Sequence, residues 1–186
     1  LSDPPYGVLN VAWDRPLSFD DVSMAMMFTT GAVMMFNACA PDKMQHVLNF
    51  PVLPDRIFVW RLTGHIPQKG PNQPFWTWQP VYVWNLGKMA CWDSCEFEGA
   101  SPDVTGEHPT QKPIGLLVKY IEAAKDTKSV LDLFLGSGST LIACEKTGRR
   151  CFGMELDPKY CDVILTRWEQ FTGKTATLET PEHREV

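Results

Sequence analysis

The sequence predicts an α/β fold with a mostly parallel sheet and helices on both of its faces. Short apolar runs with strand character recur along the chain, and capped or amphipathic helical stretches follow them, which is the pattern of that class. The 186 residues, of which 44% are hydrophobic, suffice for one domain with a substantial core. No apolar run reaches the roughly 18 residues that span a membrane, so we expect no membrane partner.

In the first half of the chain, caps indicate helices and apolar runs indicate strands. Ser18 can cap a first helix, and the acids Asp20 and Asp21 suit the positive end of its dipole. Pro80 restricts the strand around it to a sheet edge or a bulge. A segment rich in Gly, Pro, Gln and Asn at 63–74 predicts a loop. The elements expected here are helices at 18–30 and 42–50 and strands at 32–38, 56–62 and 76–86.

A segment at 88–107 has no hydrophobic period and carries Gly, Ser, Pro and Asp, which predicts a connector between the two halves. A helix from residue 113 is indicated by apolar positions at 3.6-residue spacing. Asp157 can cap the last helix, and Pro158 suits its first turn. The elements expected here are helices at 113–124, 140–147 and 158–171, strands at 129–134 and 150–155, and a polar tail at 174–186.

Asp3-Pro4-Pro5-Tyr6 places a carboxylate, two prolines and an aromatic ring within four residues. Asp3 can accept a hydrogen bond from an amine, the prolines present carbonyls without competing N–H donors, and Tyr6 offers a face for stacking. The set therefore suits the binding of a planar amine. On these residues alone, an ordinary turn after a strand is the alternative.

A glycine turn follows the strand expected at 129–134. Gly136 and Gly138 let a ligand approach the backbone, and Glu155, 19 residues after Gly136, can bind ribose hydroxyls. The third glycine of the dinucleotide fingerprint is missing, and no lysine follows the turn as it does in a P-loop. The pattern predicts a site for an adenosine-bearing ligand, with an ordinary strand-to-helix turn as the alternative.

The cysteines and the net charge argue against other kinds of site. Cys91, Cys95 and His108 form at most an incomplete metal site, because no second Cys or His pair completes it. We therefore expect no metal, and reduced thiols. The net charge of −5 argues weakly against nucleic acid as a partner, although a local basic groove is compatible with it.

A third motif, His108-Pro109-Thr110-Gln111-Lys112-Pro113, holds polar groups between two prolines, which alone also fits a capped loop. In this order the three motifs resemble those of the β-group amino-methyltransferases of DNA, which use S-adenosyl-L-methionine. The resemblance extends from Asp3 to about Gly173. It implies a Rossmann-like fold in circularly permuted order, with the catalytic motif ahead of the cofactor motif, in a cytoplasmic bacterial or phage-like protein.

The resemblance also implies roles for the matching positions. The catalytic set is Asp3, Pro4, Pro5 and Tyr6, which hold a base that has been flipped out of DNA. Glu155 is implied to bind the ribose. The implied cofactor set is Asp3, His108, Thr110, Lys112, Asp132, Phe134, Gly136, Ser137, Gly138, Ser139, Glu155 and Leu156, with Thr110 and Lys112 near the methionine moiety.

Two features depart from the family pattern. Members of the family have a strand ahead of the catalytic motif, so we expect a strand upstream of Leu1. The recognition region is short, so target recognition is expected from 88–107, from the loop at 63–78, or from a homodimer partner or separate specificity element. The expected organisation is one methyltransferase domain at 1–173, with a catalytic half at 1–87, the connector at 88–107, a cofactor half at 108–173, and a flexible tail at 174–186.

Within the resemblance, Asp rather than Ser at position 3 favours methylation of adenine N6 in DNA. Cytosine N4, or an amine of RNA, is the alternative on the same scaffold. A catalytically silent nucleic-acid-binding module is the alternative from another class, and the intact Asp3, Tyr6 and Glu155 argue against it. A nucleotide-dependent oxidoreductase is disfavoured by the incomplete glycine fingerprint.

Overall fold

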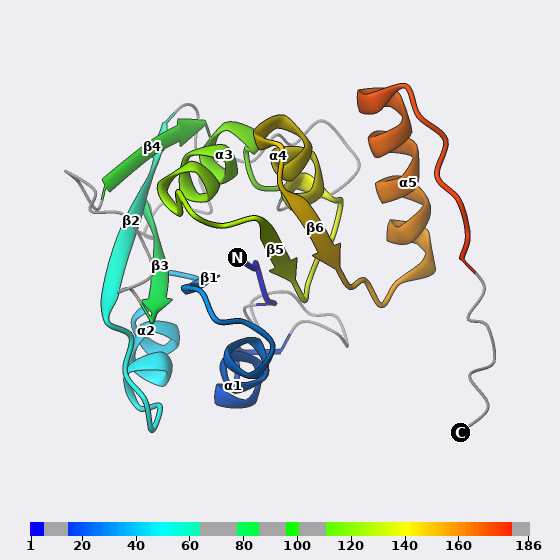
Figure 1. Cartoon of the computed structure of the whole chain (residues 1–186). Helices are drawn as coiled ribbons and strands as arrows, with labels where there is room; N and C mark the ends of the chain where they lie inside the picture. Colours follow the sequence, from blue (N-terminus) through cyan, green and yellow to red (C-terminus); the bar gives the residue numbers. More distant parts are fainter. Residues whose placement is uncertain (6–14, 64–77, 86–95, 101–110, 180–186) are drawn as a thin grey trace, which may run out of the picture.

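The computed structural model describes residues 1–5, 15–63, 78–85, 96–100 and 111–179, in which helices are interspersed with strands along the chain (Figure 1). The α/β class is therefore confirmed, and nearly all of the expected helices and strands appear within a few residues of their predicted bounds. The elements are α1 (Phe19–Phe28), β1 (Val33–Phe36), α2 (Pro41–Leu48), β2 (Arg56–Thr63), β3 (Trp78–Trp84), β4 (Glu96–Ala100), α3 (Ile114–Ala123), β5 (Ser129–Asp132), α4 (Ser139–Thr147), β6 (Arg150–Gly153) and α5 (Pro158–Thr172).

Two helix starts form as their cap residues predict. Ser18 Oγ accepts a hydrogen bond from the Asp21 backbone N–H, and the Asp21 carboxylate accepts one from the Ser18 N–H, which completes a capping box for α1. The Asp157 carboxylate accepts a hydrogen bond of 2.9 Å from the Lys159 N–H at the start of α5. No helix among the described residues is long and apolar enough to cross a membrane.

The strands form a four-stranded sheet in the order β1-β3-β2-β4 and a two-stranded sheet of β5 and β6. Pairing is parallel between β2 and β4 and between β5 and β6, whereas β3 runs antiparallel to both β1 and β2. The sheet is thus more mixed than a mostly parallel one. A parallel connection needs a crossover, usually a helix, and the sequence between β2 and β3 has no helical pattern, so antiparallel pairing of these neighbours is the simpler outcome.

The segment 88–107, which the sequence predicts to be a connector between two halves, contains β4, a strand that the sequence did not indicate. β4 pairs in parallel with the second half of β2, from Val59 opposite Glu96 to Thr63 opposite Ala100. Its sequence, EFEGA, has no apolar run and includes a glycine, which strands disfavour. This strand is defined by its backbone pairing with β2, and a hydrophobic pattern alone does not reveal it.

Residues 1 and 2 join the two sheets. The Leu1 amino group donates to the Leu131 carbonyl of β5 at 3.2 Å. On the other side, the Ser2 N–H donates to the Met34 carbonyl at 2.9 Å, and the Phe36 N–H donates to the Ser2 carbonyl at 3.1 Å. Because this bridge is parallel to β1, the chain leaves it at the carboxyl ends of β1 and β5.

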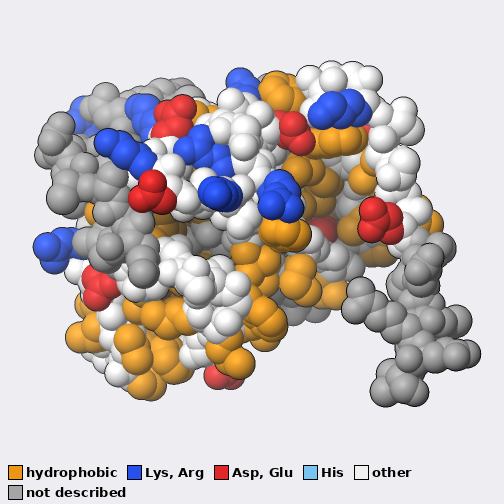
Figure 2. Space-filling model, viewed as in Figure 1, with side chains coloured by type: hydrophobic (Ala, Val, Ile, Leu, Met, Phe, Trp, Pro, Cys, Tyr) orange, Lys and Arg blue, Asp and Glu red, His pale blue; other side chains and the backbone are white. Residues whose placement is uncertain are grey.

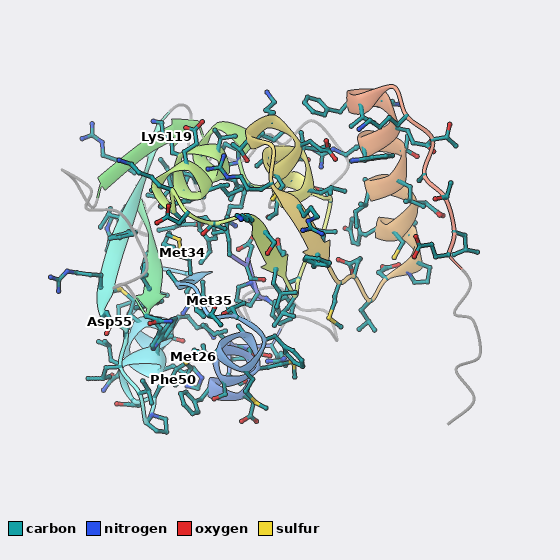
Figure 3. The ribbon with its side chains drawn as sticks, in the orientation of Figure 1. Met26, Met34, Met35, Phe50, Asp55 and Lys119 are labelled. Carbon is teal, nitrogen blue, oxygen red and sulfur yellow. The ribbon has the colours of Figure 1, made fainter. Side chains whose placement is uncertain are left out.

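Both faces of β1 are buried, and this places helices on both sides of the four-stranded sheet, as expected. Met34 and Phe36 belong to one apolar cluster, which α3 and α4 complete. Val33 and Met35 belong to a second cluster, with residues of α1 and α2. In Figure 3, Met35 lies on the side of α1 with Met26 and Phe50, whereas Met34 lies on the other side of β1.

The outer surface of α1 and α2 is also apolar. Figure 2 shows hydrophobic side chains gathered over the part of the molecule where Figure 1 places these helices. Met27 and Phe28 at the end of α1 are 82% and 72% exposed, and Leu48 and Val52 near α2 are each 46% exposed. Among the described residues, these side chains are left largely or half exposed.

Candidate active site

Polar groups gather at the carboxyl ends of β1, β5 and β6, which is where ligands bind in open α/β sheets. The segment 3–5 emerges beside β1, as described above. The glycine turn 136–138 follows β5, and Glu155 follows β6. Lys112 reaches the same edge from the residue before Pro113, the N-cap of α3.

The glycine turn requires its glycines. Gly136 and Gly138 have φ values of 54° and 83°, in the left-handed region that residues with a Cβ rarely adopt. A Cβ on Gly138 would also lie 3.2 Å from Ile164 Cγ1 of α5. The turn therefore brings the backbone of residues 136–138 close to the ligand side of the sheet and begins α4 at Gly138.

Glu155 is held against this turn by three backbone groups. Its Oε2 accepts a hydrogen bond of 2.7 Å from the Gly136 N–H. Its Oε1 accepts from the N–H groups of Leu156 and Asp157 at 2.8 and 2.9 Å. A carboxylate so constrained is fixed in direction, and its remaining lone-pair capacity can accept from a hydroxyl of a ligand.

Asp132, the last residue of β5, joins the glycine turn to the segment 3–5. It is 2% exposed, and its Oδ1 accepts hydrogen bonds from Ser2 Oγ at 2.5 Å and from the Phe134 N–H at 3.1 Å. Burial raises the pKa of Asp132, and the hydrogen bonds from Ser2, Thr140 and Phe134 oppose that rise. Ser2 and Asp132 thus hold together two segments 130 residues apart in the chain.

Asp3 and Lys112 form an ion pair at the centre of the site. Lys112 Nζ lies 2.5 Å from Asp3 Oδ2, and the side chains are 4% and 25% exposed, respectively. The same ammonium lies over the rings of Phe36 and Trp60, at 5.2 and 5.8 Å from their centroids. The predicted catalytic carboxylate is therefore paired with a residue predicted for the cofactor set.

One buried polar atom beside the turn is unsatisfied. Ser139 is 6% exposed at the start of α4, and its Oγ has no hydrogen-bond partner within the part of the chain that the structure describes. Buried hydroxyls are almost always hydrogen-bonded, so this Oγ is available to a group that binds at the start of α4. The positive end of the α4 dipole at this point suits a negatively charged or electron-rich group.

Arg167 joins α5 to the turn, because its Nη1 donates to the Ser137 carbonyl. It also lines an open hollow of about 290 Å³ with Ile114, Ile142, Gln170 and Phe171. Sequence reasoning missed both Arg167 and Ser2. Arg167 lies three residues after Ile164, on the buried side of α5, and this spacing could have indicated that it faces the turn. For Ser2, the sequence offers only its place next to Asp3.

Most of the predicted site residues are described, and the structure brings them together where the carboxyl ends of β1, β5 and β6 lie. Tyr6, His108 and Thr110 lie outside the described residues, as do Cys91 and Cys95 of the incomplete metal motif. The residues found at these strand ends are Asp3, Pro4, Pro5, Lys112, Asp132, Phe134, Gly136, Ser137, Gly138, Ser139, Glu155 and Leu156.

Comparison with known proteins finds type II methyltransferases among the relatives of this chain. The type II methyltransferase M2.MboI of Moraxella bovis is 25% identical over 174 residues, which cover 92% of this chain and 54% of that protein. The type II methyltransferase M.HinfI of Haemophilus influenzae is 44% identical over 73 residues, covering 39% of this chain and 20% of the relative. The chain thus spans about half the length of M2.MboI, and its match to M.HinfI is shorter still.

Solved structures share the fold. A complex of M1.HpyAVI with SAM superimposes with a TM-score of 0.67 at 20% identity, covering 89% of this chain and 86% of that one. The cytosine-N4-specific PvuII DNA methyltransferase gives a TM-score of 0.64 at 16% identity, covering 93% and 82%. The Rossmann-like fold expected from the sequence is thereby confirmed. A family model for DNA methylases of the N6/N4 type matches residues 55–166, more than half of the sequence, and the chain belongs to this family.

Proposed function

We propose that this chain transfers a methyl group from S-adenosylmethionine to the exocyclic amine of a base in DNA, with adenine N6 as the first candidate. The observation that carries the proposal is the Ser2–Asp132 hydrogen bond, which holds the segment 3–5 against the glycine turn across 130 residues of sequence. An amine-binding motif and a nucleoside-binding motif that meet at one sheet edge suit group transfer between their two ligands.

The residues at the glycine turn fit the cofactor. The fixed Glu155 carboxylate suits the ribose hydroxyls, the glycines admit close approach, and the unpaired Ser139 Oγ offers a further polar contact. His108 and Thr110 are predicted to complete the set. When bound, S-adenosylmethionine supplies a methyl group on a positively charged sulfur, and it requires no covalent attachment to the protein. The remaining predicted contacts are Phe134, Gly136, Ser137, Gly138 and Leu156.

Asp3 and the Pro4 carbonyl are proposed to activate the amine. The lone pair of an exocyclic amine is delocalised into the ring, so the nitrogen is a poor nucleophile. Hydrogen bonds from both N–H groups to Asp3 and to the Pro4 carbonyl favour a tetrahedral nitrogen, whose lone pair is then available for attack. The cysteines have no part in this scheme, because no covalent intermediate is needed.

The base must leave the duplex before its amine can reach Asp3. An amine paired within DNA is inaccessible to a side chain, so enzymes of this kind flip the nucleotide into a pocket. Tyr6 is the proposed stacking partner, and stacking of this kind contributes about 1–3 kcal/mol per base. The target sequence would be recognised by residues 88–107, by the loop at 63–78, or by a second subunit or specificity element.

The choice of adenine rests on Asp rather than Ser at position 3. Cytosine N4 is the second candidate, because a cytosine-N4-specific enzyme shares the fold over most of its length. Both bases present an exocyclic NH2 group beside a ring nitrogen, so the same two acceptors suit either. An amine of RNA is a third substrate that the same chemistry allows.

Methyl transfer from labelled S-adenosylmethionine to unmethylated DNA tests the proposal. We expect incorporation by the native sequence, with N6-methyladenine as the product on nucleoside analysis, and a loss on the order of 10²-fold in Asp3→Ala. The matched control is Asp55→Ala, which removes an exposed carboxylate just before β2 (Figure 3), a strand that β3 and β1 separate from the chain start at Ser2. A folded protein that binds DNA without methylating it would instead be a silent binding module.

A further inference from the structure

We propose that Lys112 is a positioning residue that acts through Asp3: it fixes the orientation of the carboxylate that accepts the amine. This inference rests on the proposed function, and it assigns Lys112 a place different from the methionine moiety that the family resemblance implies. The observation behind it is the 2.5 Å contact between Lys112 Nζ and Asp3 Oδ2, across 109 residues of sequence.

The buried surroundings of Lys112 require a counter-charge, and Asp3 supplies it. The lysine side chain is 4% exposed, so its charge has lost nearly all contact with water. A buried ammonium is costly unless a counter-charge and further favourable contacts compensate it. Asp3 provides the counter-charge, and the faces of Phe36 and Trp60 lie close enough for cation–π attraction. Both rings belong to the rigid core, since Phe36 and Trp60 are each 0% exposed.

The lysine is also held at its backbone end. Pro113 follows it directly and is the N-cap of α3, whose first turn returns hydrogen bonds from Leu116 and Leu117 to the Pro113 carbonyl. The position of Nζ is therefore set by a helix start at one end and by two core rings at the other. A charge fixed in this way can orient a neighbouring side chain that is less buried than the lysine.

Asp3 is such a neighbour, because a quarter of its side chain is exposed and it directly follows Leu1 and Ser2, which bond to β5 and β1. A charge-assisted hydrogen bond to Oδ2 fixes the plane of the carboxylate. With that plane fixed, the remaining lone pairs point in defined directions, as an acceptor of an amine N–H requires. Small errors in such positioning are expensive, since a shift of about 1 Å can lower a rate on the order of 10²-fold.

The test compares Lys112→Met, which keeps length and removes charge, with Lys112→Arg, which keeps charge. The matched control is Lys119→Met, because Lys119 is exposed on α3 and carries the same side chain (Figure 3). We expect Lys112→Met to lower kcat at least tenfold while the dissociation constants for S-adenosylmethionine and for DNA change less than about threefold. Lys112→Arg should recover part of kcat, and Lys119→Met should leave every value unchanged.

A double-mutant cycle with Asp3→Ala separates positioning from a general loss of structure. If Lys112 acts through Asp3, Lys112→Met has a smaller effect in the Asp3→Ala variant than in the native sequence. This holds both for turnover and for the urea midpoint. Additive effects on both quantities would overturn the inference. So would weaker S-adenosylmethionine binding, measured by calorimetry, in proportion to the fall in kcat, because Lys112 would then be a ligand of the cofactor.

The two proposals fail in different ways. If the native sequence binds DNA and S-adenosylmethionine but transfers no methyl group, the proposed function fails whatever Lys112 does. If the native sequence is active and Lys112→Met retains full kcat, the positioning role alone is wrong. If Lys112→Met folds poorly, Lys112→Gln replaces it in the same comparisons. The urea midpoints of Lys112→Gln, Asp3→Ala and the double variant then measure the coupling between the two residues without turnover.

Discussion

The two sheets of this molecule are held in place by different means. In the four-stranded sheet, all of β1 and most of β3 are buried, and Trp60, Tyr82 and Trp84 are at most 1% exposed. In the two-stranded sheet, β6 is largely exposed, with Phe152 at 56%. The glycine turn beside β6 depends instead on hydrogen bonds to Glu155 and Asp132. Apolar burial stabilises the four-stranded sheet, whereas polar contacts shape the glycine turn that follows β5.

This contrast predicts that truncating an aromatic side chain costs far more stability in the four-stranded sheet than in the two-stranded sheet. Trp84→Ala removes a ring that is 1% exposed, together with the hydrogen bond from its Nε1 to the Val52 carbonyl, so it should cost about 3–5 kcal/mol. Phe152→Ala on β6 should cost about 1 kcal/mol or less, because the ring is already mostly in water. Urea unfolding of both variants measures the difference, and equal losses would contradict the contrast.

The glycine turn should tolerate even a methyl group poorly. Gly138→Ala combines a φ of 83° with a contact of 3.2 Å to Ile164, so we expect a loss of about 1–2 kcal/mol and weaker binding of S-adenosylmethionine. Gly148→Ala is the matched control, since its φ is 67° and a Cβ there meets nothing within 4 Å. It should lose stability through backbone strain while keeping its affinity for the cofactor. Equal affinities in the two variants would show that the turn does not form the cofactor site.

The smallest expected effect concerns pH. Burial raises the pKa of Asp132 in the folded protein above the ordinary value of an aspartate, so the folded state favours the protonated carboxyl. The associated stability is fully present below the unfolded pKa and is lost as pH rises through the folded pKa. Asp132→Asn lacks this titration, so its stability relative to the native sequence should increase from about pH 4 towards neutrality. Urea midpoints at several pH values measure it, and a constant or falling difference would show that the hydrogen bonds outweigh burial.

Local chemistry predicts the helices and most strands, because caps such as Ser18 and Asp157 and apolar runs such as 32–38 act over a few residues. The glycine turn and the acid at 155 were likewise visible in their spacing, and the structure joins them by a hydrogen bond from the Gly136 N–H to Glu155. β4 escaped prediction because it depends on pairing with β2. The Lys112–Asp3 and Ser2–Asp132 contacts escaped it because each joins segments more than 100 residues apart, and no local pattern encodes such a pair.

The central claim is that the edge shared by the two sheets is a methyl-transfer site with Asp3 as the acceptor for the amine. The most direct measurement is methyl incorporation into unmethylated DNA by the native sequence and by Asp3→Ala, with cofactor binding recorded for both. We predict labelled N6-methyladenine from the native sequence and a loss on the order of 10²-fold in the variant at unchanged cofactor affinity. Full turnover by Asp3→Ala with cofactor bound would contradict the account.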